Sequence, residues 1–391
     1  MKNDWRKVRL GDIIDFNPKE NLSKGTFAKK VSMEHLYPYT KQISGYEISS
    51  FSGGSKFRNG DTIMARITPC LENGKTAQVN VLETGEIGFG STEFVVLREM
   101  KNISDNNFIY YLTISPALRD IAIKSMIGTS GRQRVQQDVI ENLNIFLPPF
   151  SIQQSIASIL SCLDDKIELN RKINDYLEQM AQAVFKSWFV DFEPFSDGEF
   201  VDSELGKIPR GWRVGTLGEV AKMSAGGDKP KLFSKTQVEG CTIPIYSNGI
   251  DDEGLFGYTD IPKIFSESVT VSARGTIGYT YLRLHPYVPI VRLVSLEPIP
   301  EIVSSKYLYL WLLNSHITGT GTTQQQLTVP DFNKQSILLP SYTIMEKFTN
   351  IVTPLFAQIE ANKTENLKVA AIRDTLLPKL MSGEIEVKSV P

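Results

Sequence analysis

The chain contains an internal repeat, and this repeat restricts the folds that it can adopt. LPPFSIQQSIASIL, residues 147–160, resembles LPSYTIMEKFTNIV, residues 339–352. Ser151 and Thr343 are each followed three positions later by Gln or Glu, which is the capping-box pattern of a helix start. Two copies of a helix entrance within 391 residues predict a duplicated architecture.

The repeat extends upstream of the two helix entrances. Trp5-Arg6 reappears as Trp212-Arg213, and Ala65-Arg66 reappears as Ala273-Arg274. The chain is therefore predicted to run as domain, helix, domain, helix. The predicted parts are a first domain at 1–147, a long helix at 148–193, a linker at 194–211, a second domain at 212–340, a second long helix at 341–380 and a tail at 381–391.

Each predicted long helix carries apolar residues at spacings of three and four, which favours a coiled-coil-like seam. Neither Pro nor Gly occurs from Phe150 to Glu193. This stretch allows a helix of roughly 35 to 40 residues, which spans ~55 Å at 1.5 Å per residue. Pro354 predicts a kink in the second helix. Asn170 and Asn362 interrupt equivalent seam positions, either as a buried pair that fixes register or as two partly exposed residues.

The obvious partner for each seam is the other helix, and we expect the two to pack antiparallel. Alternating β-branched segments and shorter apolar helical segments, at 106–123 and 304–314, flank the long helices. The predicted fold class is therefore α/β (α+β) with a two-fold internal repeat: two mixed α/β domains separated by two long helices that form an antiparallel coiled coil.

Composition narrows the functional classes. The net charge is −2, from 42 basic and 44 acidic residues, so a nucleic-acid role would depend on local basic patches or on partner subunits. No apolar run approaches the ~18 residues of a membrane span, and the first residues lack a signal-peptide core. We therefore expect a cytoplasmic protein without a membrane partner.

Long, ordered motifs resemble those of the specificity (S) subunits of type I restriction-modification systems. They include GDTIMARITPCLENGKTAQV, the LPPF helix entrance, DDKIELNRKINDYLEQMAQAVFKSWFVDFEP, DSELGKIPRGW and RDTLLPKLMSGEIEV. The resemblance covers essentially the whole chain. It implies two target-recognition domains that each read half of a split double-stranded DNA site, with the helix pair as spacer. It also implies docking of two methyltransferase (M) subunits and of motor-nuclease (R) subunits.

The resemblance implies that this chain is a non-catalytic subunit that holds no cofactor of its own. S-adenosylmethionine, ATP and Mg²⁺ are expected on the partner subunits. A stand-alone adenine methyltransferase is the first alternative, but its Asp/Asn-Pro-Pro-Tyr/Phe motif needs a polar first residue where this chain has Leu147 and Leu339. A coiled-coil adaptor that never contacts bases is the second alternative. The histidines are far apart in sequence and show no metal-ligand spacing.

Side-chain chemistry indicates which residues could read DNA. Arg recognises guanine, Gln recognises adenine, and Lys mostly contacts phosphate. Equivalent loops in the two halves therefore supply candidate base contacts, although polar loops leading to the helices would have the same composition. The candidate base contacts are Arg132, Gln133, Arg134, Gln324, Gln325 and Gln326, and the candidate phosphate contacts are Lys29, Lys30, Lys75, Lys229, Lys231 and Arg274.

Two further features have both a functional and a structural interpretation. Arg66 occupies the same Ala-Arg setting as Arg274, which favours a structural ion pair for Arg66. Aromatic residues are concentrated near the end of the first long helix, where they could form a docking surface for an M subunit or pack against their own domain. The aromatic candidates for partner binding are Phe185, Trp188, Phe189 and Phe192.

Overall fold

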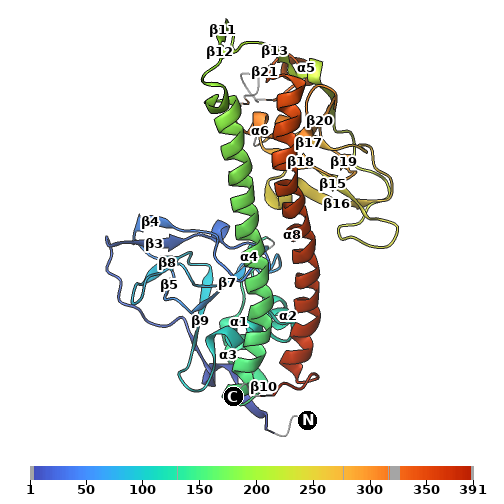
Figure 1. Ribbon diagram of the computed structural model, residues 1–391. Helices are drawn as coiled ribbons and strands as arrows, with labels where there is room; N and C mark the ends of the chain where they lie inside the picture. The colour runs from blue at the N-terminus through green and yellow to red at the C-terminus, as the bar shows by residue number, and fades with distance from the viewer. Residues whose placement is uncertain (1–3, 130, 276, 316, 318–325, 389–391) are drawn as a thin grey trace. The chain divides into compact units, whose positions relative to one another are not determined.

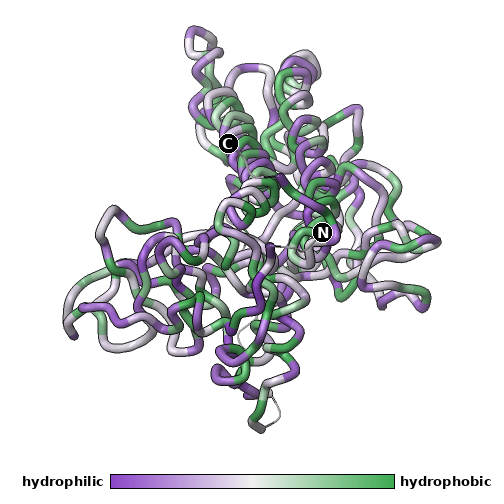
Figure 2. The backbone as a smooth tube through the Cα atoms, turned by 90° about the horizontal axis from the view of Figure 1, so that it is seen from below, coloured by the Kyte–Doolittle hydropathy of each residue, from purple (hydrophilic) through white to green (hydrophobic). Residues whose placement is uncertain are grey.

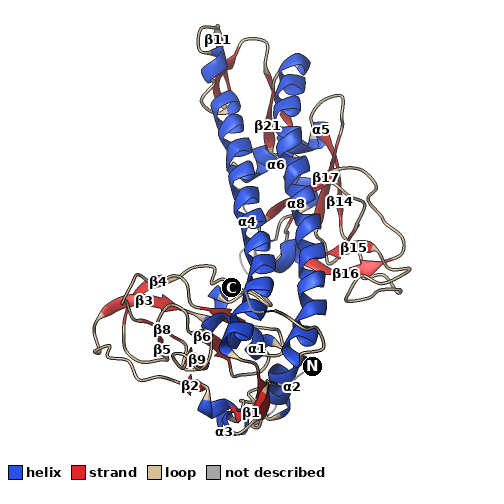
Figure 3. Ribbon diagram, turned by 60° about the horizontal axis from the view of Figure 1, so that its bottom comes forward, coloured by secondary structure: helices blue, strands red, loops and turns tan. Residues whose placement is uncertain are grey.

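The computed structural model describes residues 4–129, 131–275, 277–315, 317 and 326–388. The chain divides into two compact units. Unit 1 comprises Met1–Lys172 and Asn362–Pro391, and unit 2 comprises Ile173–Ala361. The long helices α4 (Phe150–Phe189) and α8 (Tyr342–Ser382) each contribute one half to each unit (Figure 1). Both units combine helices with short strands, as Figure 3 shows, which confirms the predicted mixed α/β class.

The part of unit 1 that precedes α4 is built from short elements. They are β1 (Arg6–Arg9), η1 (Leu10–Asp12), β2 (Ile14–Phe16), β3 (Phe27–Val31), η2 (Met33–His35), β4 (Glu47–Ser50), β5 (Lys56–Phe57), β6 (Thr62–Ala65), β7 (Thr76–Gln78), β8 (Gly88–Gly90), β9 (Phe94–Glu99), α1 (Asn106–Ile114), α2 (Pro116–Lys124), α3 (Gln137–Glu141) and β10 (Asn144–Leu147).

These strands form three sheets within the described residues. One is antiparallel with the order β2-β9-β6-β7. A second has the order β4-β3-β8-β5, in which β3 and β8 run parallel. The third pairs β1 with β10, so the start of the chain lies beside the strand that leads into α4. The helix entrance is therefore fixed to the domain that precedes it in sequence.

Unit 2 begins with the second half of α4 and ends with the first half of α8. Its other elements are η3 (Glu193–Phe195), β11 (Phe200–Ser203), β12 (Gly206–Pro209), β13 (Arg213–Thr216), α5 (Leu217–Val220), β14 (Ala221–Ala225), β15 (Ile243–Tyr246), η4 (Asp251–Gly254), β16 (Leu255–Thr259), β17 (Ser268–Val271), β18 (Thr280–Arg283), β19 (Val288–Pro289), β20 (Val294–Pro298), α6 (Ser305–Leu313), α7 (Val329–Phe332) and β21 (Ser336–Leu339).

The topology of unit 2 repeats that of unit 1. Its antiparallel sheet has the order β14-β20-β17-β18, and a second sheet has the order β16-β15-β19 with β15 and β19 parallel. The two-stranded sheets match in register: Arg6 lies opposite Leu147, and Arg213 lies opposite Leu339. The predicted duplication is therefore confirmed. The segment predicted as a linker, 194–211, contains the antiparallel hairpin β11–β12.

The core helices next to the long helices begin at side-chain caps. The carboxylate of Asp105 accepts the N–H of Phe108 (2.9 Å) at the start of α1, and the hydroxyl of Ser304 accepts the N–H of Tyr307 (3.2 Å) at the start of α6. The single helix predicted over 106–123 is divided into α1 and α2 at Pro116, because proline has no N–H to continue the hydrogen-bonding pattern of α1.

The two long helices begin one residue before Ser151 and Thr343. The capping-box prediction is therefore wrong, because both hydroxyl residues lie inside the first turn. In α4 the buried side chain of Gln153 fixes the entrance instead. Its Nε2 donates to the carbonyls of Pro148 (3.0 Å) and Ile103 (3.0 Å). This joins the helix start to the loop that precedes α1.

The predicted antiparallel packing of the long helices is confirmed inside unit 1. Asp164 on α4 pairs with Arg373 on α8, and Ile167, three residues further along α4, accepts a hydrogen bond from Asn366, which precedes Arg373 on α8. The two helices therefore run in opposite directions. Hydrophobic and hydrophilic residues are interspersed along the chain in Figure 2. Helix α8 continues through Pro354 without a break.

The interrupting asparagines are both buried, so the interpretation of two partly exposed positions is wrong. Asn170 donates from Nδ2 to Glu365 Oε2 (2.7 Å) and to Asn366 Oδ1 (2.9 Å). These bonds join α4 to α8 within unit 1. A buried polar side chain needs hydrogen-bond partners on the facing helix. It therefore favours the one alignment of the two helices that supplies them over alignments shifted along the helix axis.

A buried ionic cluster holds the C-terminal half of α8 in unit 1. Arg373 Nη1 lies 2.6 Å from Asp164 Oδ1, and both side chains are 6% exposed. The hydroxyl of Tyr111 donates to the second carboxylate oxygen (2.6 Å). Burial and the Asp164 charge raise the pKa of Tyr111, so this hydroxyl stays a neutral donor.

Unit 2 solves the same packing problem with apolar side chains. When the alignment of 147–160 with 339–352 is continued along the helices, Asp164 matches Phe356 and Arg373 matches Ala181. Both of these residues are buried in the main core of unit 2. The repeat therefore conserves the helix pairing while it replaces an ion pair by hydrocarbon.

Replacing Arg373 by Met should lower the free energy of unfolding of unit 1 by about 3–5 kcal/mol, because Asp164 would remain buried and unpaired. Asp164→Leu/Arg373→Met should recover most of this loss. The free energy is measured in the full chain from the urea dependence of hydrogen exchange in α1.

Lys379→Met serves as the control, because Lys379 lies 3.8 Å from Glu384 and both are well exposed; its effect should stay within about 0.5 kcal/mol. Equal losses for Arg373→Met and Lys379→Met would contradict the role given to the buried cluster.

Candidate nucleic-acid interface

In unit 1, the candidate reading loop is fixed to the end of strand β6. The N–H of Val135 donates to the carbonyl of Arg66 (2.8 Å), and the N–H of Thr68 donates to the carbonyl of Gln133 (3.0 Å). The loop backbone is thus tied to the residues that follow β6. The side chain of Arg132 is exposed, and that of Gln133 is half-buried.

Arg134 is bound by a carboxylate of its own unit. Its Nε lies 2.9 Å from Glu93 Oε2 and its Nη2 lies 2.6 Å from Glu93 Oε1, a two-pronged arrangement. Hydrogen bonds from Arg134 lower the pKa of Glu93, and the charge of Arg66 adds to this effect. Arg66 thus lies near the same carboxylate, but its Nε is buried without a hydrogen-bond partner among the described residues.

The three candidate lysines of unit 1 are also engaged by protein groups. Lys29 is only 9% exposed, so the prediction that it contacts phosphate from the surface conflicts with its burial. Lys30 and Lys75 are more accessible. Their partners are Glu86 (3.0 Å) and the carbonyl of Val81 (3.0 Å) for Lys29, Glu47 (3.5 Å) for Lys30, and the carbonyl of Met33 (2.9 Å) for Lys75.

In unit 2, the equivalent loop meets the end of strand β17. The N–H of Leu327 donates to the carbonyl of Ala273 (3.1 Å), which parallels the link between Val135 and Arg66. Arg274 is exposed, and its Nη2 lies 3.4 Å from Gln326 Oε1. The candidates Gln324 and Gln325 lie outside the described residues. Equivalent backbone positions thus present different side chains in the two units.

A tight turn next to Arg274 was not predicted. Val291 and Arg292 both have positive φ, 52° and 61°, and both are exposed. Left-handed backbone in a β-branched residue is rare and costs energy. The amide of Asn248 ties the turn in place, because its Nδ2 donates to Val291 O (2.6 Å) and its Oδ1 accepts the N–H of Ala273 (2.8 Å). No glycine stands at this turn to indicate it in the sequence.

Lys229 and Lys231 lie on an exposed segment of unit 2. The ammonium group of Lys229 sits 3.6 Å from the centroid of the Phe233 ring, a cation–π contact. Neither lysine lies within ion-pair distance of a carboxylate in the part of the chain that the structure describes. These two candidates therefore remain accessible.

Two of the four aromatic candidates for partner binding lie in the core of unit 2. Phe185 and Phe189 are 0% and 2% exposed, and both contact the ring of Phe348 on α8. They cannot form a docking surface in this structure, because neighbouring rings already cover them. Trp188 and Phe192 are partly exposed and stay candidates for partner binding.

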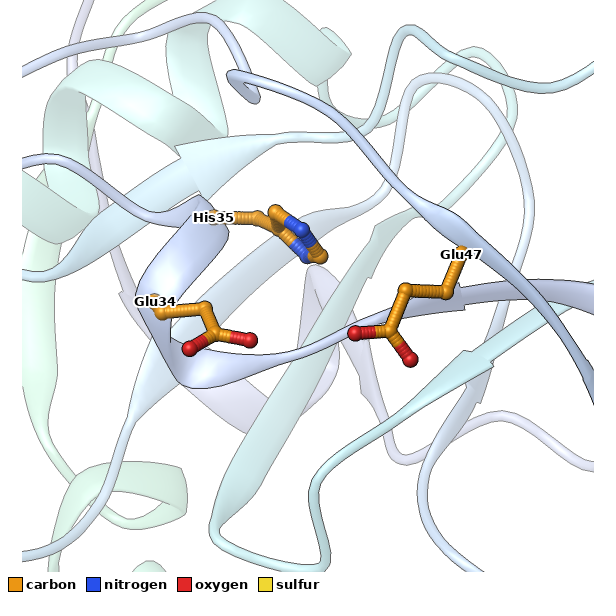
Figure 4. Close-up of side chains that lie close together, drawn as sticks. All are labelled: Glu34, His35 and Glu47. Atoms are coloured by element: carbon orange, nitrogen blue, oxygen red, sulfur yellow. The ribbon is translucent and has the colours of Figure 1, made fainter. Parts of the chain in front are cut away.

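Glu34, His35 and Glu47 are grouped closely enough to suggest a metal site (Figure 4). However, His35 Nδ1 accepts the backbone N–H of Ser32 (3.1 Å). A neutral imidazole that accepts at Nδ1 carries its proton on Nε2, which removes the lone pair that a metal would need. Lys30 also pairs with Glu47. The cluster therefore does not fit a metal ion.

Comparison with known proteins places this geometry in a family. None of the described helices is both long enough and apolar enough to cross a membrane. The chain is 31% identical to the MjaIX specificity subunit of Methanocaldococcus jannaschii, a match that covers 90% of this chain and 86% of that protein. It is 27% identical to the HindI specificity subunit of Haemophilus influenzae, with 98% and 100% covered.

A solved structure, the S subunit of the type I restriction-modification system from M. genitalium, has a similar fold, with a TM-score of 0.54 at 18% identity over 96% of both chains. The family described as "Type I restriction modification DNA specificity domain" matches residues 2–179 and 209–371. Since these two matches cover most of the sequence, the chain belongs to the family of type I restriction-modification specificity subunits, which are non-catalytic and determine DNA specificity.

Proposed function

We propose that this chain reads a bipartite site on double-stranded DNA, with 1–147 recognising one half and 212–340 recognising the other. The observation that carries the proposal is the repeated topology with unlike loops. The same Ala-Arg pair lies at the end of β6 and two residues beyond the end of β17, but the adjoining loops differ, with Gln133 and Arg134 in unit 1 and Gln326 in unit 2. Two domains that recognise different DNA sequences can share one fold but need different side chains at the DNA contacts.

The chemistry of these loops suits base recognition. Arg binds the O6 and N7 atoms of guanine, and Gln binds the N6 and N7 atoms of adenine. Arg132 and Arg134 are exposed, and Gln133 and Gln326 are partly exposed. A contact from Arg134 to a base would require this side chain to exchange Glu93 for guanine.

We assign the helices a second role as a spacer. Helix α4 has 40 residues, which corresponds to about 60 Å at 1.5 Å per residue. Half-sites one turn of DNA apart are separated by about 34–36 Å. The helix pair would fix the gap between half-sites and form the scaffold on which two M subunits and the R subunits dock. Those partners would carry S-adenosylmethionine, ATP and Mg²⁺. Assembly on DNA would place the chain in the cytoplasm.

Coexpression of the chain with its M subunit should methylate adenine in one bipartite sequence, and methylome sequencing would identify that sequence. Gln133→Ala should relax recognition in one half-site only, and Gln326→Ala in the other, at a cost of about 1–3 kcal/mol per lost base contact. If either substitution changed both half-sites, the assignment of one unit to each half would be wrong.

Insertion of four residues, about one helical turn, into both α4 and α8 should lengthen the gap in the methylated sequence while leaving both half-sites unchanged. The insertions belong near the middle of the helices, away from the Asp164–Arg373 cluster. A four-residue insertion in α4 alone, which would break the register with α8, is the matched control and should abolish methylation. An unchanged gap in the double insertion would exclude the spacer role.

A further inference from the structure

We propose that unit 2 carries the principal surface that anchors the sugar-phosphate backbone of duplex DNA, so that the salt dependence of DNA binding arises mainly there. The inference rests on the proposed function and adds a division of labour between the two units. It depends on which cations are already neutralised by the protein. The surface is formed by six exposed cations: Lys229, Lys231, Lys235, Lys263, Arg274 and Arg292.

A continuous series of contacts links the loops that carry these cations. Ala273, next to Arg274, donates its N–H to Asn248, and Asn248 donates to the carbonyl of Val291. The N–H of Val291 donates to Gly227 (2.9 Å), and Arg292 donates to the preceding glycine (2.8 Å). Arg274, Arg292 and the segment that begins at Gly227 therefore lie on one connected surface within unit 2.

Lys263 joins the same surface at Gly227. A Cβ built on this glycine would lie 3.4 Å from Lys263 Nζ, so the ammonium group approaches the bare backbone closely. The Lys263 ammonium group therefore lies beside the 227–235 segment, near the turn at Val291.

Two aromatic rings position the cations at the far end of this surface. Lys229 Nζ lies 3.6 Å from the centroid of Phe233, and Lys235 Nζ lies 4.1 Å from the centroid of Phe256. The two rings contact each other, with centroids 5.9 Å apart. Each ring attracts an ammonium group without neutralising its charge. The lysine side chains therefore lose less conformational entropy on binding a phosphate than freely rotating lysines would.

These six cations differ from the candidates Lys29, Lys30 and Arg134 of unit 1 in having no internal counterion in the part of the chain that the structure describes. Among the described residues, none of the six cations lies within 4.0 Å of a carboxylate oxygen. Asp228 and Asp260 are exposed acidic neighbours in sequence but form no such pair. These cations are consequently surrounded by mobile counterions, which phosphate binding would release.

In unit 1, three of the cations predicted to contact DNA form ion pairs with carboxylates of the protein. Lys29 is bound to Glu86, Lys30 to Glu47, and Arg134 to Glu93. Moving such a cation to a phosphate would leave a carboxylate unpaired beside another anion. Exchanging the carboxylate partner of such a cation for a DNA phosphate releases few counterions and gains little Coulomb energy. Arg132 is the exposed candidate of unit 1 that has no ion pair among the described residues.

The test measures the salt dependence of binding by the complex of this chain with its M subunit to a duplex that carries the methylated sequence. The slope of log K against log [salt] should become shallower by about 1.8 in Lys229→Ala/Lys231→Ala, because each phosphate contact contributes about 0.9. The loss of affinity should be equal for the cognate duplex and for a scrambled duplex, since phosphate contacts do not read sequence.

Two matched double variants complete the design. Lys207→Ala/Lys222→Ala removes two exposed charges from β12 and β14 and should leave the slope unchanged. Lys30→Ala/Arg134→Ala removes two ion-paired charges from unit 1 and should change the slope by much less than 1.8. A slope change in this unit 1 variant equal to or larger than that of Lys229→Ala/Lys231→Ala would overturn the inference. If the unsubstituted complex failed to prefer the cognate duplex at every salt concentration, the proposed function itself would fail.

Discussion

The apolar stripes of the two long helices are the constraint on which the rest of the structure depends. A short domain cannot bury the apolar face of a 40-residue helix over its whole length. Each half of α4 and of α8 is therefore buried in one of the two units. Unit 1 covers its share with α1 and an ion pair, and unit 2 with a cluster of aromatic rings. The strands and the candidate reading loops are positioned from these helices, because β10 and β21 lead directly into them.

The two copies have diverged where a shared fold allows it. Sheet order, strand register and the Ala-Arg pair after the central strand are retained. The helix junction has changed from the Asp164–Arg373 pair to Phe356 and Ala181. The loops near the ends of β6 and β17 have changed as well, in side chains and in the distribution of ion pairs. A conserved frame with altered contacts fits the proposed reading of two unlike half-sites.

Much of the fold could be predicted from the sequence, because a repeat and a helical periodicity are local patterns. The duplication, the long helices and the two shorter core helices were predicted from such patterns. The predicted capping boxes placed both helix starts too late, since each helix begins one residue before its hydroxyl residue. The bond from Gln153 to the carbonyl of Ile103, 50 residues away, fixes the α4 entrance and has no local sequence signal. Lys29 was predicted to contact phosphate, and Phe185 was left between docking and packing, because their partners Glu86 and Phe348 are distant in sequence. The Val291–Arg292 turn carries no glycine signal.

The long separation between Asp164 and Arg373, 209 residues, has a consequence for the order in which the protein matures on the ribosome. Domains generally fold as they emerge, the N-terminal one first. Here the first part of unit 1 is synthesised with the Asp164 carboxylate beside Tyr111, and the Arg373 guanidinium that pairs with it follows only after all of unit 2 has been synthesised. Unit 1 is thus completed after the unit that interrupts it in the sequence.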